Sequence, residues 1–181
     1  ENLTDWWVRV ADNALAAVAP NVDLMFFGDD LASQQGPLFD PVVYREFIKP
    51  HHRRMIGVAK EHGVKAVYHS CGAVSSLVED LVDIGADALN PVQVSAKDMD
   101  PVHLKAAFGS RITFWGGINT QSVLPLGTPD EVRCEVRRII DCLGRDGGYV
   151  LNSVHNIQDD VPAENIVAMF DEARCYEPLY A

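Results

Sequence analysis

The residues with the clearest chemical potential are His69 and Cys71, two positions apart in the segment KAVYHSCGAV. A neutral imidazole and a thiolate are both good ligands for zinc. Residues i and i+2 of a strand point to the same face, so both side chains can reach one ion at the end of a strand over residues 65–69. The alternative is a histidine hydrogen-bonded at the edge of the sheet beside a buried cysteine.

A zinc site needs a third protein ligand, and His155 is the best candidate in the sequence. It follows an expected strand over residues 148–153, and the ends of parallel strands share one side of a sheet. Asp29 and Asp30 follow another strand end, and we expect one of them to act there as a ligand, a base or a substrate contact. Their alternative role is to cap backbone N–H groups in a loop.

Two other groups carry weaker signals. A further strand end holds four candidate cofactor-binding residues: Trp115, Gly116, Gly117 and Asn119. Its glycines would let a ligand approach the backbone closely, and tight packing at the strand end is the alternative. His51 and His52 lie beside two arginines in a helical run, which indicates a solvated helix face.

The elements that must position these residues are apolar strands alternating with amphipathic helices. Near-continuous apolar runs predict parallel strands at residues 23–28, 65–69, 86–91, 111–117 and 148–153. Helices are predicted near residues 3–18, 40–63, 72–85, 99–109, 127–144 and 161–174. Expected caps are Thr4 or Asp5, Asp40, and Thr128 with Glu131 as a capping box, and Pro50 should kink or divide its helix.

Alternating strands and helices predict an α/β fold, either an open doubly wound sheet or a (β/α)₈ TIM barrel. No glycine-rich nucleotide-binding loop follows any expected strand, which weakens the open-sheet alternative. The polar candidates all follow strand ends, where barrel enzymes keep their chemistry. We therefore expect the C-terminal five strand-helix units of a barrel.

The composition excludes several classes of protein. The 181 residues carry a net charge of −11 without a basic face, which argues against nucleic acid and anionic membranes as partners. No apolar run approaches the roughly 18 residues of a membrane helix. Four cysteines in a chain of this length do not make a disulfide scaffold, so a reducing, cytoplasmic setting is expected.

Five segments, in order and spacing, resemble the uroporphyrinogen decarboxylase superfamily: FFGDDLASQQGPLFDPVVYREFIKPHH, HSCGAV, LNPVQVSAKDMDPVHLKAAFG, TFWGGINTQSVLPLGTPDEVRCEV and GGYVLNSVHNIQDDVPAEN. The resemblance runs from about residue 20 to 173 and implies a (β/α)₈ barrel. Residues 1–181 would form the C-terminal part of a single barrel domain, with roughly three more units before Glu1. Five strands alone leave sheet edges unpaired, so pairing into a homo-oligomer is also expected.

The superfamily contains two chemistries, and this sequence has one feature of each. In its cobalamin-dependent methyltransferases, zinc is held by His-x-Cys-Gly and a later Cys in a PGCG-like motif. His69 and Cys71 match the first part, and His155 occupies the place of the later Cys. True decarboxylases generally lack His-x-Cys but have a His at the position of His155, in a GHGI-like motif. The His-x-Cys pair favours methyl transfer.

The resemblance to the methyltransferases implies zinc bound by His69, Cys71 and His155, and methylcobalamin carried by a separate corrinoid protein. The zinc-bound thiolate of a small-molecule substrate would take the methyl group from cobalt(III) and leave cobalt(I). A histidine in place of a cysteine ligand removes one negative charge, so the acceptor is expected to differ from coenzyme M. Two alternatives stay open: a decarboxylase acting on a tetrapyrrole such as uroporphyrinogen, and a degenerate barrel that binds without turnover.

Overall fold

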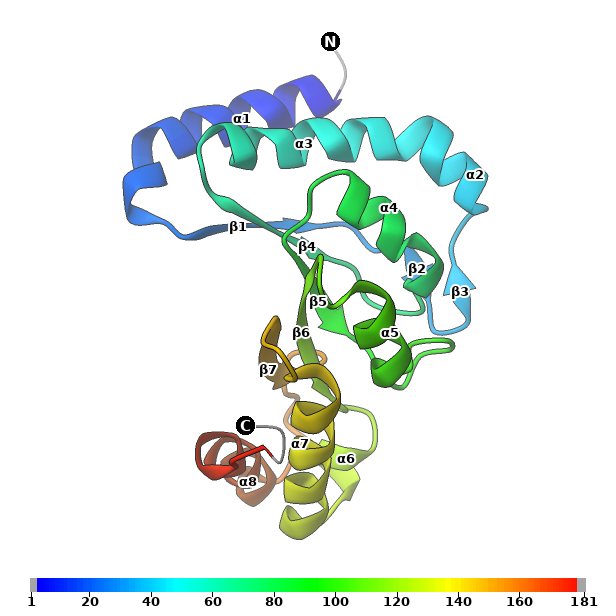
Figure 1. Cartoon of the computed structure of the whole chain (residues 1–181), viewed down its shortest axis with the longest axis vertical. Coiled ribbons are helices and arrows are strands. Elements are labelled where there is room, and N and C mark those ends of the chain that lie inside the picture. Colours follow the sequence, from blue (N-terminus) through cyan, green and yellow to red (C-terminus); the bar gives the residue numbers. More distant parts are fainter. Residues whose placement is uncertain (1–2, 179–181) are drawn as a thin grey trace. The chain divides into compact units, whose positions relative to one another are not determined.

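The computed structural model describes residues 3–178 and consists of two compact units, a first unit of residues 1–89 and a second unit of residues 90–181. Figure 1 traces the chain through both units, and each is described by itself below.

The first unit alternates helices with strands and adds a small hairpin. Its elements are α1 (Leu3–Val18), η1 (Ala19–Asn21), β1 (Leu24–Gly28), β2 (Ala32–Ser33), β3 (Gly36–Pro37), α2 (Pro41–Val43), η2 (Tyr44–Ile48), α3 (Lys49–Glu61), β4 (Lys65–His69), η3 (Ser75–Leu77) and α4 (Val78–Asp83). The antiparallel hairpin of β2 and β3 was not predicted, because its strands have two residues each and show no hydrophobic alternation.

The second unit continues the alternation. The boundary between the units falls within the sequence of strand β5 (Ala88–Val92). The elements after it are α5 (Pro101–Phe108), β6 (Thr113–Ile118), α6 (Val123–Leu126), α7 (Pro129–Leu143), β7 (Tyr149–Ser153) and α8 (Ala163–Cys175).

The predicted α/β class is confirmed. The sheet has five strands in the order β1-β4-β5-β6-β7. In the first unit β1 runs parallel to β4, with Gly28 opposite His69, and in the second unit β6 runs parallel to β7, with Ile118 opposite Ser153. Each predicted strand lies within two residues of an observed one, because buried parallel strands carry long apolar runs.

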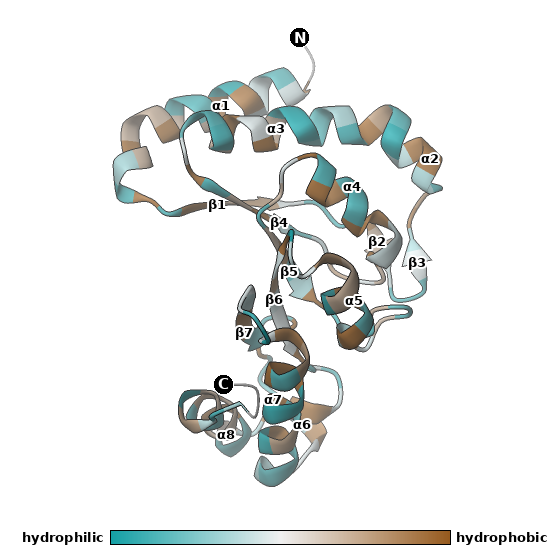
Figure 2. Cartoon of the chain, in the orientation of Figure 1, coloured by the Kyte–Doolittle hydropathy of each residue, from teal (hydrophilic) through white to brown (hydrophobic). Residues whose placement is uncertain are grey.

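The helices pack through apolar faces that the sequence period predicts. Helix α7 buries Val132, Val136, Ile139 and Leu143, which recur at helical spacing. Figure 2 shows the matching alternation of brown and teal along α7. The remaining face of α7 is charged, so the helix covers apolar neighbours on one side only.

Most of the predicted helix ends are confirmed. Asp40 accepts a hydrogen bond from the Val42 backbone N–H at 2.8 Å, and Thr128 and Glu131 form a complete capping box. The predicted caps of the first helix are wrong, because Thr4 and Asp5 lie inside α1. Their side chains instead contact α3: Thr4 Oγ1 is 3.0 Å from His51 Nδ1, and Asp5 accepts from Arg54.

Pro50 divides its helix as expected, because a proline lacks an N–H and cannot complete the preceding turn. The chain accommodates it with the π-helical turn η2, which lies between α2 and α3. The turn buries the Tyr44 side chain completely. Such π-turns are rare and often occur at functional sites.

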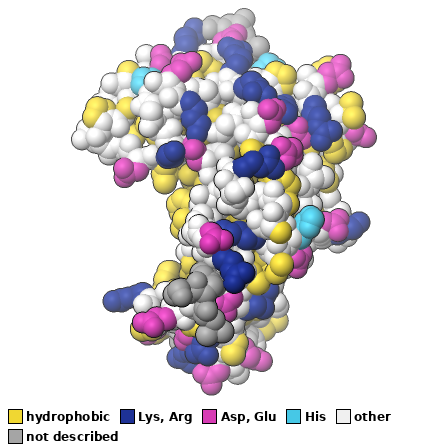
Figure 3. Space-filling model, in the orientation of Figure 1, with side chains coloured by type: hydrophobic (Ala, Val, Ile, Leu, Met, Phe, Trp, Pro, Cys, Tyr) yellow, Lys and Arg dark blue, Asp and Glu magenta, His cyan; other side chains and the backbone are white. Residues whose placement is uncertain are grey.

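The surface mixes charges of both signs. Figure 3 shows Lys and Arg side chains interspersed with Asp and Glu over the face that it draws. In the first unit several of them form ion pairs, among them Arg53 with Asp83 at 2.7 Å. Within residues 3–178, no helix combines the length and apolar character that crossing a membrane requires.

Candidate metal centre

The end of β4 places His69 and Cys71 beside the chain that leaves β1. Gly28 lies opposite His69 in the parallel ladder, and the Asp29 N–H donates to the His69 carbonyl at 3.1 Å. The pairing therefore continues one residue past β1 and fixes the start of the following turn. Asp30 comes next, and its side chain lies near the two predicted ligands.

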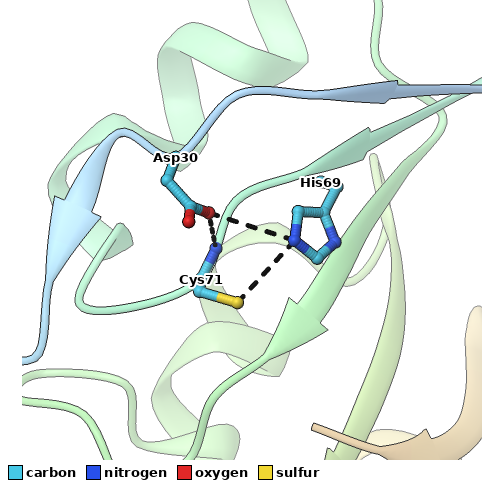
Figure 4. A group of neighbouring side chains, drawn as sticks. All are labelled: Asp30, His69 and Cys71. Atoms are coloured by element: carbon cyan, nitrogen blue, oxygen red, sulfur yellow. Dashed lines mark hydrogen bonds and ion pairs between the residues drawn. The ribbon is translucent and has the colours of Figure 1, made fainter. Parts of the chain in front are cut away.

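Asp30, His69 and Cys71 form a group whose candidate ligand atoms all lie within 4.8 Å of one another (Figure 4). Cys71 Sγ is 3.7 Å from His69 Nε2, and His69 Nε2 is 3.9 Å from Asp30 Oδ1. The sequence predicted that the His69 and Cys71 side chains could reach one metal ion. It offered Asp30 only as one of two adjacent carboxylates.

Hydrogen bonds between the loop after β1 and the loop after β4 hold the group in place. The Cys71 N–H donates to Asp30 Oδ1 at 2.8 Å, so the carboxylate is anchored to the backbone of the cysteine. The Leu31 N–H donates to the buried Ser70 hydroxyl at 2.9 Å. Each loop therefore satisfies backbone or side-chain groups of the other, which preorganises the three candidate ligands.

Close backbone packing adds to this connection. The Ala73 N–H donates to the Ser33 carbonyl at 2.8 Å. Gly72 directly precedes Ala73, and a Cβ built on it would be only 2.5 Å from the Ser33 carbonyl oxygen and 2.7 Å from that of Ala32. A glycine is thus required for the β2 strand to approach the His69–Cys71 segment.

The geometry of the group fits a tetrahedral metal ion. Zinc binds sulfur at about 2.3 Å and nitrogen at about 2.1 Å, which puts the two atoms roughly 3.6 Å apart at a tetrahedral angle. The observed separation of Cys71 Sγ and His69 Nε2 is 3.7 Å. Thiolate, imidazole and carboxylate are all zinc ligands, so the donor set also fits.

The electrostatics of the group favour a cation. Burial raises the pKa of the Cys71 thiol, and the neighbouring Asp30 carboxylate raises it further. Both effects disfavour a second negative charge next to Asp30. A divalent cation would reverse this balance, because it stabilises the thiolate directly.

The neighbouring Asp29 takes a different partner. Its Oδ2 is 3.2 Å from Nε2 of His52, whose Nδ1 is 3.1 Å from the Tyr68 hydroxyl and 3.4 Å from that of Tyr44. The expectation of a solvated His52 is wrong, since only 8% of the residue is exposed. The arginines beside it misled the interpretation, because they form exposed ion pairs with Asp83 and Asp5 while His52 is buried.

Burial lowers the pKa of His52, against the opposing effect of the Asp29 carboxylate. The imidazole is therefore neutral near pH 7. A sequence signal existed: Tyr44, His52, Met55 and Ile56 recur at spacings that place them on one helix face.

The second unit holds the other predicted site residues. His155 follows β7 and is exposed, and its carbonyl accepts a hydrogen bond from Ser153 Oγ at 2.7 Å. Asn119 follows β6, where its side-chain oxygen accepts from the backbone N–H groups of Gln121 and Ser122 at 2.7 and 3.0 Å. Asn119 therefore stabilises the turn before α6.

Packing accounts for the two glycines of β6. A Cβ on Gly117 would lie 2.8 Å from a methyl carbon of Ile139, and one on Gly116 would lie 3.2 Å from Pro91 Cβ. Trp115 precedes them and is half-buried. Cofactor binding by these residues stays a prediction.

Strand-helix repetition and a candidate metal group after a strand end define a class of α/β protein built like a barrel enzyme. The chain belongs to the uroporphyrinogen decarboxylase (URO-D) family, whose model matches residues 1–176. Its relatives are enzymes of two kinds. It is 27% identical to the methylated-thiol–coenzyme M methyltransferase of Methanosarcina mazei over 80% of this chain and 36% of that protein.

Two further relatives show the same division. The methylcobamide:CoM methyltransferase MtaA of Methanosarcina barkeri is 28% identical over 86% of this chain and 42% of its own length. The uroporphyrinogen decarboxylase of Syntrophotalea carbinolica is 30% identical over 75% of this chain and 38% of its own length. The chain thus spans well under half the length of these relatives.

A solved structure agrees on the fold. A methyltransferase from Methanosarcina mazei superposes with a TM-score of 0.71 at 23% identity, over 94% of this chain and 46% of the other. The five strands and their helices therefore correspond to part of a URO-D-like barrel.

Proposed function

We propose that this chain is part of a zinc-dependent methyltransferase that moves a methyl group between a corrinoid protein and a thiol. The observation that carries the proposal is the group of His69, Cys71 and Asp30, with sulfur and nitrogen 3.7 Å apart. A decarboxylase has no evident need of a thiol beside an imidazole. The relatives named as methyltransferases support the same choice.

His69 and Cys71 are the proposed core of the zinc site, and there are two candidates for the third protein ligand. Asp30 already lies in the group, while His155 is supported by its place in the family motif. With either one as the third protein ligand, the proposed site would keep one position open for the substrate sulfur. We propose the site as part of a single barrel domain.

Zinc bound there would lower the pKa of a substrate thiol so that it reacts as a thiolate near neutral pH. The protein supplies the rest by holding its donors still. The Cys71 N–H fixes Asp30 Oδ1 at 2.8 Å, and this is the same oxygen that lies 3.9 Å from His69 Nε2. The centroids of the His69 and Phe26 rings are 5.8 Å apart, and this neighbour restricts the movement of the imidazole.

The proposed partners follow from this chemistry. The acceptor is a small-molecule thiol, and the methyl donor is methylcobalamin held by a separate corrinoid protein. Two exposed carboxylates, Asp29 and Asp30, border this part of the site. They would disfavour an anionic acceptor, in line with an acceptor other than coenzyme M. A cytoplasmic location is part of the proposal.

A uroporphyrinogen-type decarboxylase is the second candidate. His155 favours it, because this histidine stands where the resemblance places a histidine of the decarboxylases. Decarboxylase relatives match the chain at an identity similar to that of the methyltransferases, for example 30% in Syntrophotalea carbinolica. In that case His155, and not Cys71, would be essential.

The metal content and two activities of the full-length protein test the proposal. We expect about one zinc per chain after purification without chelators, and its loss in Cys71→Ser. Thiol-dependent demethylation of methylcobalamin should disappear in Cys71→Ala. His155→Cys should raise this rate if His155 is a ligand, because an added negative ligand makes the bound thiolate more nucleophilic.

The decarboxylase makes the opposite forecast. Decarboxylation of uroporphyrinogen would survive Cys71→Ala and fall in His155→Cys. That pattern, with no thiol-dependent demethylation in any variant, would reverse the ranking of the two functions. Asp30→Asn and His155→Ala identify the third ligand, since only the loss of a true ligand should release zinc to a competing chelator.

A further inference from the structure

The structure contains a buried histidine that the proposed chemistry leaves unused. His52 lies on α3, is 8% exposed, and has hydrogen-bonding partners at both ring nitrogens. Its Nε2 faces Asp29, while its Nδ1 faces Tyr68 and, at a longer distance, Tyr44. The histidine thus connects a buried pair of hydroxyls with a carboxylate at the end of β1.

The hydrogen-bonding partners of His52 show which of its ring nitrogens carries the proton. A carboxylate only accepts hydrogen bonds, so Nε2 must carry the proton that it shares with Asp29 at 3.2 Å. Nδ1 is then the acceptor, and the Tyr68 hydroxyl donates to it at 3.1 Å. The imidazole is held in one tautomer and one orientation.

Asp29 is in turn held from its backbone. Its N–H donates to the His69 carbonyl at 3.1 Å, and its side chain is fixed by His52. The next residue is Asp30, whose carboxylate lies in the candidate metal group. A change in the backbone torsions of Asp29 would move Asp30 relative to His69, and the bond from His52 to the Asp29 side chain opposes such a change.

We propose that His52 is a positioning residue, which holds Asp29 and thereby keeps the Asp30 carboxylate beside His69 and Cys71. This inference rests on the metal site of the proposed function. A purely stabilising role does not explain the arrangement, because the Asp29 side chain is 65% exposed and pairs with such a partner contribute little to stability. An apolar side chain at position 52 would fill the same space without burying a polar ring.

Cobalt(II) binding tests the inference without any enzymatic turnover. The full-length protein is titrated with Co²⁺, and the visible absorption reports the ligands and geometry while the titration gives the affinity. We expect His52→Leu to lower the Co²⁺ affinity roughly tenfold or more and to change the spectrum, as loss of an outer hydrogen-bonding partner does at other metal sites. His52→Gln keeps an N–H donor and should restore most of both.

His62→Leu is the matched control. His62 Nε2 is 2.8 Å from Asp12 Oδ1, which makes a second His–Asp pair on the same helical segment away from the metal group. This variant should leave the cobalt spectrum and affinity unchanged. An equal change in His62→Leu and His52→Leu would overturn the inference, since the effect would then reflect general damage to the helix.

The link through Asp29 has its own test. Asp29→Ala alters an exposed side chain and so remains informative where His52→Leu does not fold. It should lower the affinity as much as His52→Leu, and the double variant should be no weaker than either single one. Additive losses, or an unchanged spectrum in His52→Leu, would refute the positioning role. A wild-type protein that binds no cobalt would instead remove the metal site itself, and with it the proposed function.

Discussion

Gly72→Ala is the change that most directly tests how the two loops of the candidate metal centre are joined. Gly72 has a φ of +88°, a conformation that side-chain-bearing residues rarely adopt. Its missing Cβ would lie 2.5 Å from the Ser33 carbonyl oxygen and 2.7 Å from the Ala32 carbonyl oxygen. Both obstacles are backbone atoms, so a rotamer change cannot relieve the contact.

The expected cost has two parts. A positive φ costs an alanine roughly 1–2 kcal/mol. Forcing apart packed backbone adds roughly 1–3 kcal/mol, and here it also strains the Ala73–Ser33 hydrogen bond of 2.8 Å. We therefore expect Gly72→Ala to lower the free energy of unfolding by about 2–5 kcal/mol in total.

Gly63→Ala separates the two parts. Gly63 has a similar φ of +71°, but a Cβ there would meet nothing within 4 Å. Only the conformational cost applies, so this variant should lose about 1–2 kcal/mol. Urea unfolding of both variants gives the difference, and Co²⁺ affinity shows whether the loops have separated. Equal losses in stability, with unchanged cobalt binding in Gly72→Ala, would refute the proposed close approach.

Two further predictions concern stability. Burial raises the pKa of Asp80, but hydrogen bonds from Arg45 and Lys49 lower it more, so the pKa of Asp80 is depressed in the folded protein. The ionised carboxylate therefore stabilises the fold at pH values above its unfolded pKa of about 3.9. This contribution is lost as the pH falls through the folded pKa. Asp80→Asn should therefore cost about 2 kcal/mol at neutral pH and much less in acid, measured by urea unfolding at both pH values; an equal cost at both would contradict the pairing. Thr128→Ala should lower the free energy of unfolding by about 1 kcal/mol by removing the capping box of α7, measured in the same way, and an unchanged value would contradict a contribution of the box.

The strands and most of the helix caps could be predicted because they depend on local sequence. The run KAVYH is apolar and β-branched and became β4 without a shift at either end. Thr128 and Glu131 mark the start of α7 by themselves. The β2–β3 hairpin could not be predicted in this way, because its strands have only two residues each and part of its support comes from the loop after β4, through the Ala73–Ser33 hydrogen bond.

Only the part of the candidate metal centre that lies on one strand end, His69 and Cys71, could be predicted from the sequence. His69 and Cys71 share a face because of the period of a strand, and they are 3.7 Å apart at their ligand atoms. Which of Asp29 and Asp30 joins the candidate metal group depends on which of the two carboxylates is hydrogen-bonded by a residue of another element. Helix α3 decides this by presenting His52 to Asp29, and no local pattern around Asp29 could reveal a partner 23 residues away.

The position of Asp30 changes the expected reactivity of the proposed site. The resemblance to the methyltransferases implies two thiolates and one imidazole around zinc, which together neutralise its charge. His155 in place of the second thiolate leaves one positive charge, and a bound substrate thiolate would be held tightly and react slowly. Asp30 lies in the group and carries the missing negative charge. With Asp30 as a ligand, the set of His69, Cys71 and Asp30 is again neutral with Zn²⁺, so the exchange of Cys for His155 need not slow methyl transfer.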